Sequence, residues 1–182
     1  MQFDLSALVR AIPALLYGAS VTLRITVLSI AIGLVIGFIT GLARVWPNLV
    51  FRSISSAYIE LIRGTPLLVQ IFIVYFGLPA LGLNLDPFIA GMIAMGINSG
   101  AYIGEIVRGG IESIAKGQME AARSLGLTYW QAMRYVILPQ SLVRILPALG
   151  NEFIALLKDS SLVSTIAIAE LTRSGQIIIT RT

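Results

Sequence analysis

The sequence predicts an all-α membrane protein, a polytopic bundle of about five transmembrane helices. Of its 182 residues, 57% are hydrophobic and only 12% are charged, and the mean hydropathy is +0.88. Soluble domains are usually about one-quarter charged. Residues 25–43, 64–85 and 87–104 contain no Asp, Glu, Lys or Arg, and each window is close to the roughly 20 apolar residues that a span needs. Together these observations indicate one transmembrane domain covering residues 1–182.

The composition also excludes several kinds of chemistry. The chain has no Cys and no His, which excludes disulfides, thiol chemistry and His/Cys metal sites. No Gly-x-x-x-x-Gly-Lys-Ser/Thr motif is present, so we expect no ATPase activity in this chain and assign no catalytic residue. The net charge of +4 is not gathered on one soluble face, so we interpret it as a sign of membrane topology and not of nucleic-acid binding. We also expect no cleaved signal peptide.

The first predicted span covers residues 13–43. Residues 1–12 mix apolar and charged side chains, and we expect them to lie at the membrane interface. Arg24 interrupts the span and must snorkel, pair or face a protein interior. Three glycines lie four residues apart on one helical stripe, which favours close packing against another helix: Gly33, Gly37 and Gly41.

The second predicted span covers residues 55–78 and is broken near Gly64-Thr65-Pro66. Pro66 has no N–H to donate, so it frees a carbonyl. Broken helices at membrane depth often offer such backbone groups to a solute. A simple packing kink is an equally good interpretation. A short connector follows at residues 79–87, with Asp86 as its only charge.

The second half of the chain predicts two further spans and a last apolar segment. The third span covers residues 88–107, and a polar segment follows at about 108–131. The fourth span covers residues 132–157 and is expected to bend at Pro139 and Pro147. The polar run Lys158-Asp159-Ser160-Ser161 then leads into a last segment that begins at Leu162.

The polar segment predicts a short helix that ends at a glycine, followed by a second helix whose first turn is capped. Ala121 and Ala122 favour a helix and leave a thin surface that another backbone can approach. Gly126 is placed to end that helix in a left-handed turn. Thr128 and Gln131 have the spacing of a capping box for the next helix. The alternative is a solvated loop that is helical by chance.

The basic residues predict the orientation of the chain in the membrane. Arg44 and Arg52 flank the first loop, and four more basic residues lie in or beside the polar segment, whereas the 79–87 connector has none. Positive charge gathers on the cytoplasmic side. The polar segment is therefore expected in the cytoplasm and the N-terminus outside.

Glu120-Ala121-Ala122, Gly126 and Leu138-Pro139 resemble the cytoplasmic loop signature of binding-protein-dependent ABC transporter permeases, with Val136 where that family usually has isoleucine. The rest of the chain from about residue 55 to 171 resembles the polar amino acid branch of these permeases. The stretches that carry this resemblance are Arg63 to Gln70, Asn98 to Tyr102, Glu105 to Ile111, Leu138 to Gln140, Asn151-Glu152 and Lys158 to Leu162.

The resemblance implies a multi-pass subunit of the bacterial cytoplasmic membrane, surrounded by lipid, with several protein partners. These would be a dimer of ATPase subunits, which bind the ATP and Mg²⁺, a second permease copy or paralogue, and an extracytoplasmic solute-binding protein. The cytoplasmic loop would be a coupling helix. The residues that would dock on the ATPase are Glu120, Ala121, Ala122, Arg123 and Gly126.

The length of the chain departs from the family pattern. Such permeases continue through a complete final span and a short basic tail, whereas this chain ends at Thr182, with Arg173 and Arg181 among its last ten residues. Either the chain is shortened or its fifth span is incomplete.

Polar residues inside the predicted spans are the candidates for solute binding, because ionisable groups at membrane depth are costly. Asn98, Tyr102 and Glu105 share one helical stripe, and Glu152 and Asp159, seven residues apart, share another. These stripes either line the pathway or hold helices together. Two further candidates are Thr65, at the break, and Lys158, which could instead neutralise Asp159. Arg108 is an obvious partner for Glu105, as is Arg63 for Glu60.

Two acidic groups against one nearby lysine favour a polar amino acid as the solute, with a basic side chain such as that of arginine, histidine or lysine, or with an amide such as glutamine. The alternative is a secondary transporter driven by an ion gradient, or a channel, in which the intramembrane Glu and Asp would bind protons or sodium. The cytoplasmic polar segment argues against that alternative, because such a protein does not need it.

Overall fold

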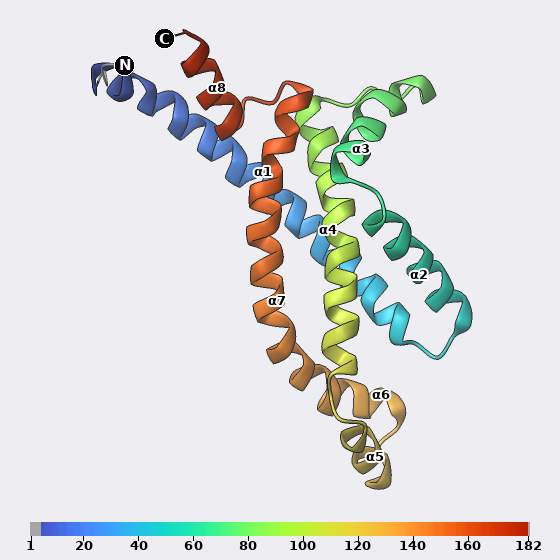
Figure 1. Cartoon of the computed structure of the whole chain (residues 1–182). Coiled ribbons are helices and arrows are strands. Elements are labelled where there is room, and N and C mark those ends of the chain that lie inside the picture. Colours follow the sequence, from blue (N-terminus) through green and yellow to red (C-terminus); the bar gives the residue numbers. More distant parts are fainter. Residues whose placement is uncertain (1–4, 182) are drawn as a thin grey trace.

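The computed structural model describes residues 5–181, and every regular element in that range is a helix (Figure 1). The longest, α1 (Leu5–Val45), runs unbroken through Pro13 and so begins before the predicted residue 13. The expected interfacial stretch is therefore helical from Leu5 onward, and its residues 1–4 lie outside the described part.

The second span is confirmed as broken, but the break is a sharp corner. Helix α2 (Leu49–Arg63) starts before the predicted residue 55, because the Asn48 side chain caps it by accepting a hydrogen bond from the Val50 N–H (2.9 Å). Helix α3 (Leu67–Phe72) follows, and the chain bends by 101° between the two arms. The second arm continues as a π turn and a 3₁₀ turn, η1 (Ile73–Gly77) and η2 (Leu78–Leu81).

Helix α4 (Pro87–Glu112) lies at the centre of the bundle, with α1 crossing it on one side and α7 (Leu138–Asp159) beside it (Figure 1). The Asp86 carboxylate caps its start by accepting from the Phe88 N–H (2.9 Å). The helix continues past the predicted end at residue 107, because Arg108 pairs with Glu105 and Glu112 along the same face. The polar segment therefore begins later than expected.

The predicted glycine stripe of α1 is the surface that packs on α4. A β-carbon at Gly37 would lie 2.5 Å from the Ile103 side chain, and one at Gly41 would lie 2.6 Å from that of Val107. The contact is reciprocal, since a β-carbon at Gly100 of α4 would lie 2.9 Å from the Ile36 side chain. Side chains of one helix thus fill the spaces left by glycines of the other, which requires the two backbones to lie very close.

The chain then forms α5 (Lys116–Ser124), α6 (Tyr129–Ala132), a π turn η3 (Met133–Ile137) and α7. The helical run of the fourth span thus extends from Tyr129 to Asp159, slightly beyond the predicted residues 132–157. The π turn lies directly before Pro139, where a hydrogen bond to the preceding turn is missing and a widened turn is accommodated. Pro147 lies inside α7.

The segment after α7 is not a single helix. It consists of the 3₁₀ helix η4 (Ser160–Ile166), a turn at Ala167 with φ of 67°, and α8 (Leu171–Arg181). The buried Glu170 carboxylate caps α8 by accepting from the N–H groups of Thr172 and Arg173, at 2.8 and 2.7 Å. The 11 residues of α8 are too few for a span, so the predicted fifth span is not present as one helix in the described range.

In the described range, α1 and one bent helix pair have both the length and the apolar composition of a membrane span, whereas α4 and α7 have the length alone. Within residues 5–181, α1 is both long and apolar enough to cross a membrane, and α2 with the α3–η2 arm forms a bent pair that passes the same test together. The 26 residues of α4 and the 22 of α7 correspond to about 39 and 33 Å of helix, against a hydrocarbon core of about 30 Å. The number of five spans remains a prediction. Both termini lie at one end of the bundle, and α5 and α6 project from the other (Figure 1).

Candidate functional site

A cavity of about 600 Å³ lies between the α2–α3 corner, α4 and the end of α7. It is lined by Arg63, Gly64, Thr65, Pro66, Leu67, Asn98, Tyr102, Glu152, Ala155, Asp159 and Leu162. Five of the six residues predicted for solute binding are therefore gathered around one space, although they come from three separate parts of the sequence. Lys158 is not among the lining residues. Successive helical positions point about 100° apart, so Lys158 faces away when Asp159 faces the cavity.

Helix α4 contributes Asn98 and Tyr102 to this cavity, one turn apart. The Asn98 side chain is buried, and its amide Nδ2 donates to the Gln70 Oε1 atom at 3.2 Å. Asn98 thus also joins α4 to α3. Glu105, on the same predicted stripe, does not line the cavity but lies in a network of ion pairs beyond it.

Helix α7 contributes both predicted carboxylates, as their seven-residue spacing on one face suggests. One oxygen of Glu152 accepts a hydrogen bond from the Ser99 hydroxyl of α4 at 2.8 Å. Asp159 is the last residue of α7 and is exposed. In the described part of the chain neither carboxylate has an ion pair, so the predicted neutralisation of Asp159 by Lys158 is not found. Both acidic groups are available to a cationic ligand.

The α2–α3 corner is braced by Gln70, a residue that the sequence interpretation did not single out. Its Nε2 amide donates to the carbonyls of Ile62 (2.8 Å) and Thr65 (3.0 Å). The Thr65 hydroxyl donates to the Leu61 carbonyl at 2.8 Å. Carbonyls that the break leaves without a helical partner are thus satisfied within the chain. The signal was the single amide in the otherwise apolar sequence of α3.

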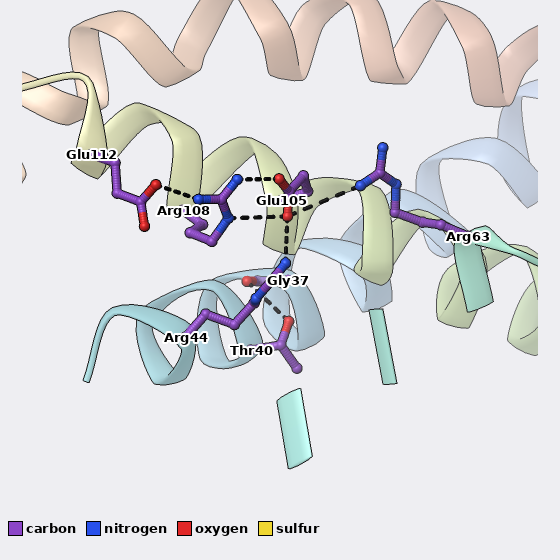
Figure 2. Close-up of polar contacts among 7 residues, drawn as sticks. All are labelled: Gly37, Thr40, Arg44, Arg63, Glu105, Arg108 and Glu112. Carbon is purple, nitrogen blue, oxygen red and sulfur yellow. Dashed lines mark hydrogen bonds and ion pairs between the residues drawn. The ribbon is translucent and has the colours of Figure 1, made fainter. Parts of the chain in front are cut away.

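Glu105 is the centre of an ion-pair network at the edge of the cavity (Figure 2). Its Oε2 atom lies 2.5 Å from Arg44 of α1 and 4.0 Å from Arg63 of α2, and Arg108 contacts both of its oxygens. The predicted pairing of Glu105 with Arg108 is confirmed. The predicted pairing of Arg63 with Glu60 is wrong, because Arg63 turns instead toward Glu105 and stacks over the Tyr102 ring, 5.2 Å from its centroid.

The predicted docking residues lie on or just after α5. Glu120, Ala121, Arg123 and Gly126 are exposed, whereas Ala122 is buried. The expected thin face therefore includes Ala121 but not Ala122. The reason is that Ala122 lies on the side of α5 that packs against the rest of the chain. Leu125, which follows α5, is 85% exposed and adds a large apolar side chain to the same end of the helix.

The turn after α5 and the restart at α6 follow the local chemistry predicted from the sequence. Gly126 is left-handed, with φ of 86°, and the Leu127 N–H returns to the Ala122 carbonyl at 3.2 Å. Thr128 and Gln131 form the predicted capping box. Partial burial raises the pKa of the Tyr129 phenol at the start of α6.

Comparisons with known proteins identify the family. Residues 33–180 match the family described as "Binding-protein-dependent transport system inner membrane component". The chain is 51% identical to the glutamine transport system permease protein GlnP of Escherichia coli K12, over 98% of this chain and 83% of that protein. It is 43% identical to the arginine transport system permease protein ArtQ of Bacillus subtilis 168, over 95% of this chain and 80% of that one.

Solved structures agree with these relatives. The crystal structure of an amino acid ABC transporter with histidines superposes with a TM-score of 0.93 at 47% identity, covering 99% of this chain and 84% of that one. The MetNI methionine ABC transporter, at 23% identity and a TM-score of 0.71, shares the fold over 85% of this chain and 75% of that one. The resemblance to an ABC transporter permease is thus confirmed, and the chain belongs to the family of binding-protein-dependent transport system inner membrane components.

Proposed function

We propose that this chain is the membrane-spanning subunit of an ATP-driven importer for a polar amino acid, with a basic or amide side chain favoured. The observation that carries the proposal is the cavity at the α2–α3 corner. Its wall places two carboxylates, of Glu152 and Asp159, with the Asn98 amide and the Tyr102 ring. A cationic or donor-rich side chain would pair with the carboxylates and offset the free energy of keeping them out of water.

The relatives support the class of solute. The proteins with 51% and 43% identity are named for glutamine and arginine, one with a neutral amide side chain and one with a cation. Both side chains carry several N–H donors and would suit acceptor oxygens. The cavity here offers such oxygens on Glu152 and Asp159.

We further propose that α5 couples the chain to a separate ATPase in the cytoplasm, with Glu120, Ala121, Arg123 and Gly126 at the contact. These residues are exposed, and α5 projects from the bundle at the end away from both termini (Figure 1). A second permease copy or paralogue and an extracytoplasmic solute-binding protein complete the proposed assembly.

Reconstituted transport tests the proposal. The chain is co-purified with its ATPase and placed in liposomes with the solute-binding protein, and uptake of labelled L-glutamine, L-arginine and L-leucine is measured. We expect ATP-dependent uptake of glutamine, arginine or both, and none of leucine, because an apolar side chain leaves the carboxylates unpaired. Uptake driven by a proton or sodium gradient without ATP would favour the secondary transporter instead.

A further inference from the structure

We infer that Arg63 recognises the α-carboxylate of the transported amino acid, moving to it from its place beside Glu105. This inference rests on the proposed function and adds the group by which the cavity would distinguish an amino acid from other cations. Every amino acid solute carries both an ammonium and a carboxylate. The carboxylates of Glu152 and Asp159 suit the cationic groups, but the solute's own carboxylate needs a partner of opposite charge.

Arg63 is the basic side chain that can supply this charge. Among the residues lining the cavity in the described chain, it is the one that is basic. Its side chain is 40% exposed, so it is not locked into the protein interior. A guanidinium presents two parallel N–H groups that match the two oxygens of a carboxylate, which a lysine ammonium cannot do.

The attachment of Arg63 to Glu105 is the weakest in the network. At 4.0 Å the pair is beyond hydrogen-bonding distance, whereas Arg44 lies 2.5 Å from the same oxygen and Arg108 bonds both oxygens of Glu105 (Figure 2). Glu105 therefore keeps two arginine partners when Arg63 leaves. The exchange replaces a distant ion pair by a direct one and leaves no carboxylate unpaired.

Tyr102 supports the Arg63 guanidinium at the wall of the cavity. Its ring lines the cavity and lies under the Arg63 guanidinium, 5.2 Å from ring centroid to Cζ. A guanidinium stacked on an aromatic face keeps its N–H edges free to bond in the plane. Because Arg63 ends α2 directly before the corner, its backbone is fixed while its side chain turns.

Ligands without a carboxylate test the inference. Binding of L-arginine and of agmatine, which is arginine lacking its carboxylate, is measured on the purified permease–ATPase complex for the parent, Arg63→Gln and Arg63→Lys. L-glutamine and 4-aminobutanamide form a second matched pair. Arg52→Gln is the control, because Arg52 is an exposed arginine of α2 that does not line the cavity.

We expect the parent to bind arginine about ten- to a hundredfold more tightly than agmatine, the effect of one charge-assisted contact. Arg63→Gln should lose this preference and bind agmatine as the parent does, which also shows that the variant is folded. Arg63→Lys should keep part of the preference, and Arg52→Gln all of it.

Two outcomes overturn the inference alone: Arg63→Gln keeping the full preference for arginine, or losing affinity for arginine and agmatine equally, as a merely structural residue would. If the parent binds neither arginine nor glutamine, the proposed function itself fails. The three results are distinguishable in one data set.

Discussion

Glu152 and Asp159 line the same cavity but differ in their contacts with the rest of the protein. Glu152 receives the Ser99 hydroxyl across the α4–α7 contact, so part of its role is to hold two helices together. Its second oxygen accepts no hydrogen bond from the described residues, and the Asp159 carboxylate lies on the same cavity wall. The two carboxylates therefore differ in how strongly the protein itself engages them.

Removing these charges one at a time should weaken solute binding. In Glu152→Gln and Asp159→Asn, we expect about a ten- to a hundredfold loss of affinity for arginine, because each variant removes a charge-assisted contact. Binding to the purified complex is the measurement. Glu60→Gln is the matched control, since Glu60 is an exposed carboxylate of α2 outside the cavity. If both variants bind arginine, histidine and glutamine as the parent does, these carboxylates act only in helix packing.

At the scale of elements, α5 and its glycine stop are the clearest separate unit. The helix has a single buried residue, Ala122, and is followed by a left-handed glycine with no atom within 4 Å of a β-carbon built there. Space therefore does not require glycine at position 126, but its φ of 86° does. The preference for glycine at position 126 therefore comes from its backbone conformation and not from a close contact with another part of the chain.

Two substitutions at this turn should differ. Gly126→Val places a β-branched residue in a left-handed conformation, at a cost of about 1–3 kcal/mol, and should shift the end of α5. Gly126→Asn tolerates that conformation. We expect Val to reduce co-purification of the ATPase and solute-stimulated ATP hydrolysis, and Asn to retain most of both. Equal and normal values for the two variants would show that the turn does not position the docking surface.

Local chemistry could be predicted from the sequence wherever neighbouring residues decide the structure. The capping box at Thr128, the left-handed Gly126 and the break at Pro66 depend on residues within one turn of each other. The glycine stripe of α1 was predictable because residues four apart in a helix lie on the same face. The partner of Arg63 was not, because Glu60 and Glu105 compete for it and only the packing of α2 on α4 places Glu105 nearby.

The helix ends and the final segment were harder to predict for a related reason. The Asn48 cap extends α2, and the ion pairs of Arg108 extend α4, into stretches whose composition is typical of loops. Residues 162–169 are apolar apart from Ser164 and Thr165, which favours a span. The structure instead turns at Ala167 and fixes α8 to α1, where the Leu171 N–H bonds the Thr22 hydroxyl at 3.2 Å. A contact across 149 residues leaves no local pattern.

At the scale of the whole molecule, the two ends of the bundle differ in charge. The end with α5 and α6 carries Lys116, Arg123 and Arg134, whereas the connector before α4 carries only Asp86. Because positive charge gathers on the cytoplasmic side, this distribution predicts an N-terminus outside the cell. Arg24 is exposed on the wall of a second cavity of about 800 Å³ that also includes Asp86, so it does not face the bundle interior.

Single cysteines in this Cys-free chain test the orientation. Asn84→Cys places a thiol at an exposed position of the connector before α4, and Gly117→Cys places one at an exposed position in the first turn of α5. In intact cells we expect an impermeant thiol reagent to label position 84 and not position 117, and to label both after the cells are opened. Labelling at 117 alone in intact cells would invert the topology.

The glycine contact between α1 and α4 joins two helices that are synthesised at different times. The Ser29 hydroxyl donates to the Met92 carbonyl, 63 residues later, at 3.1 Å. At about 5–20 residues per second, α1 waits roughly 3–13 s in the membrane before this part of α4 is made. In the described chain α1 is the helix apolar enough to span unaided, whereas α4 carries Asn98 and Glu105. The helix that is apolar enough to span unaided is therefore synthesised before the more polar helix that packs against it.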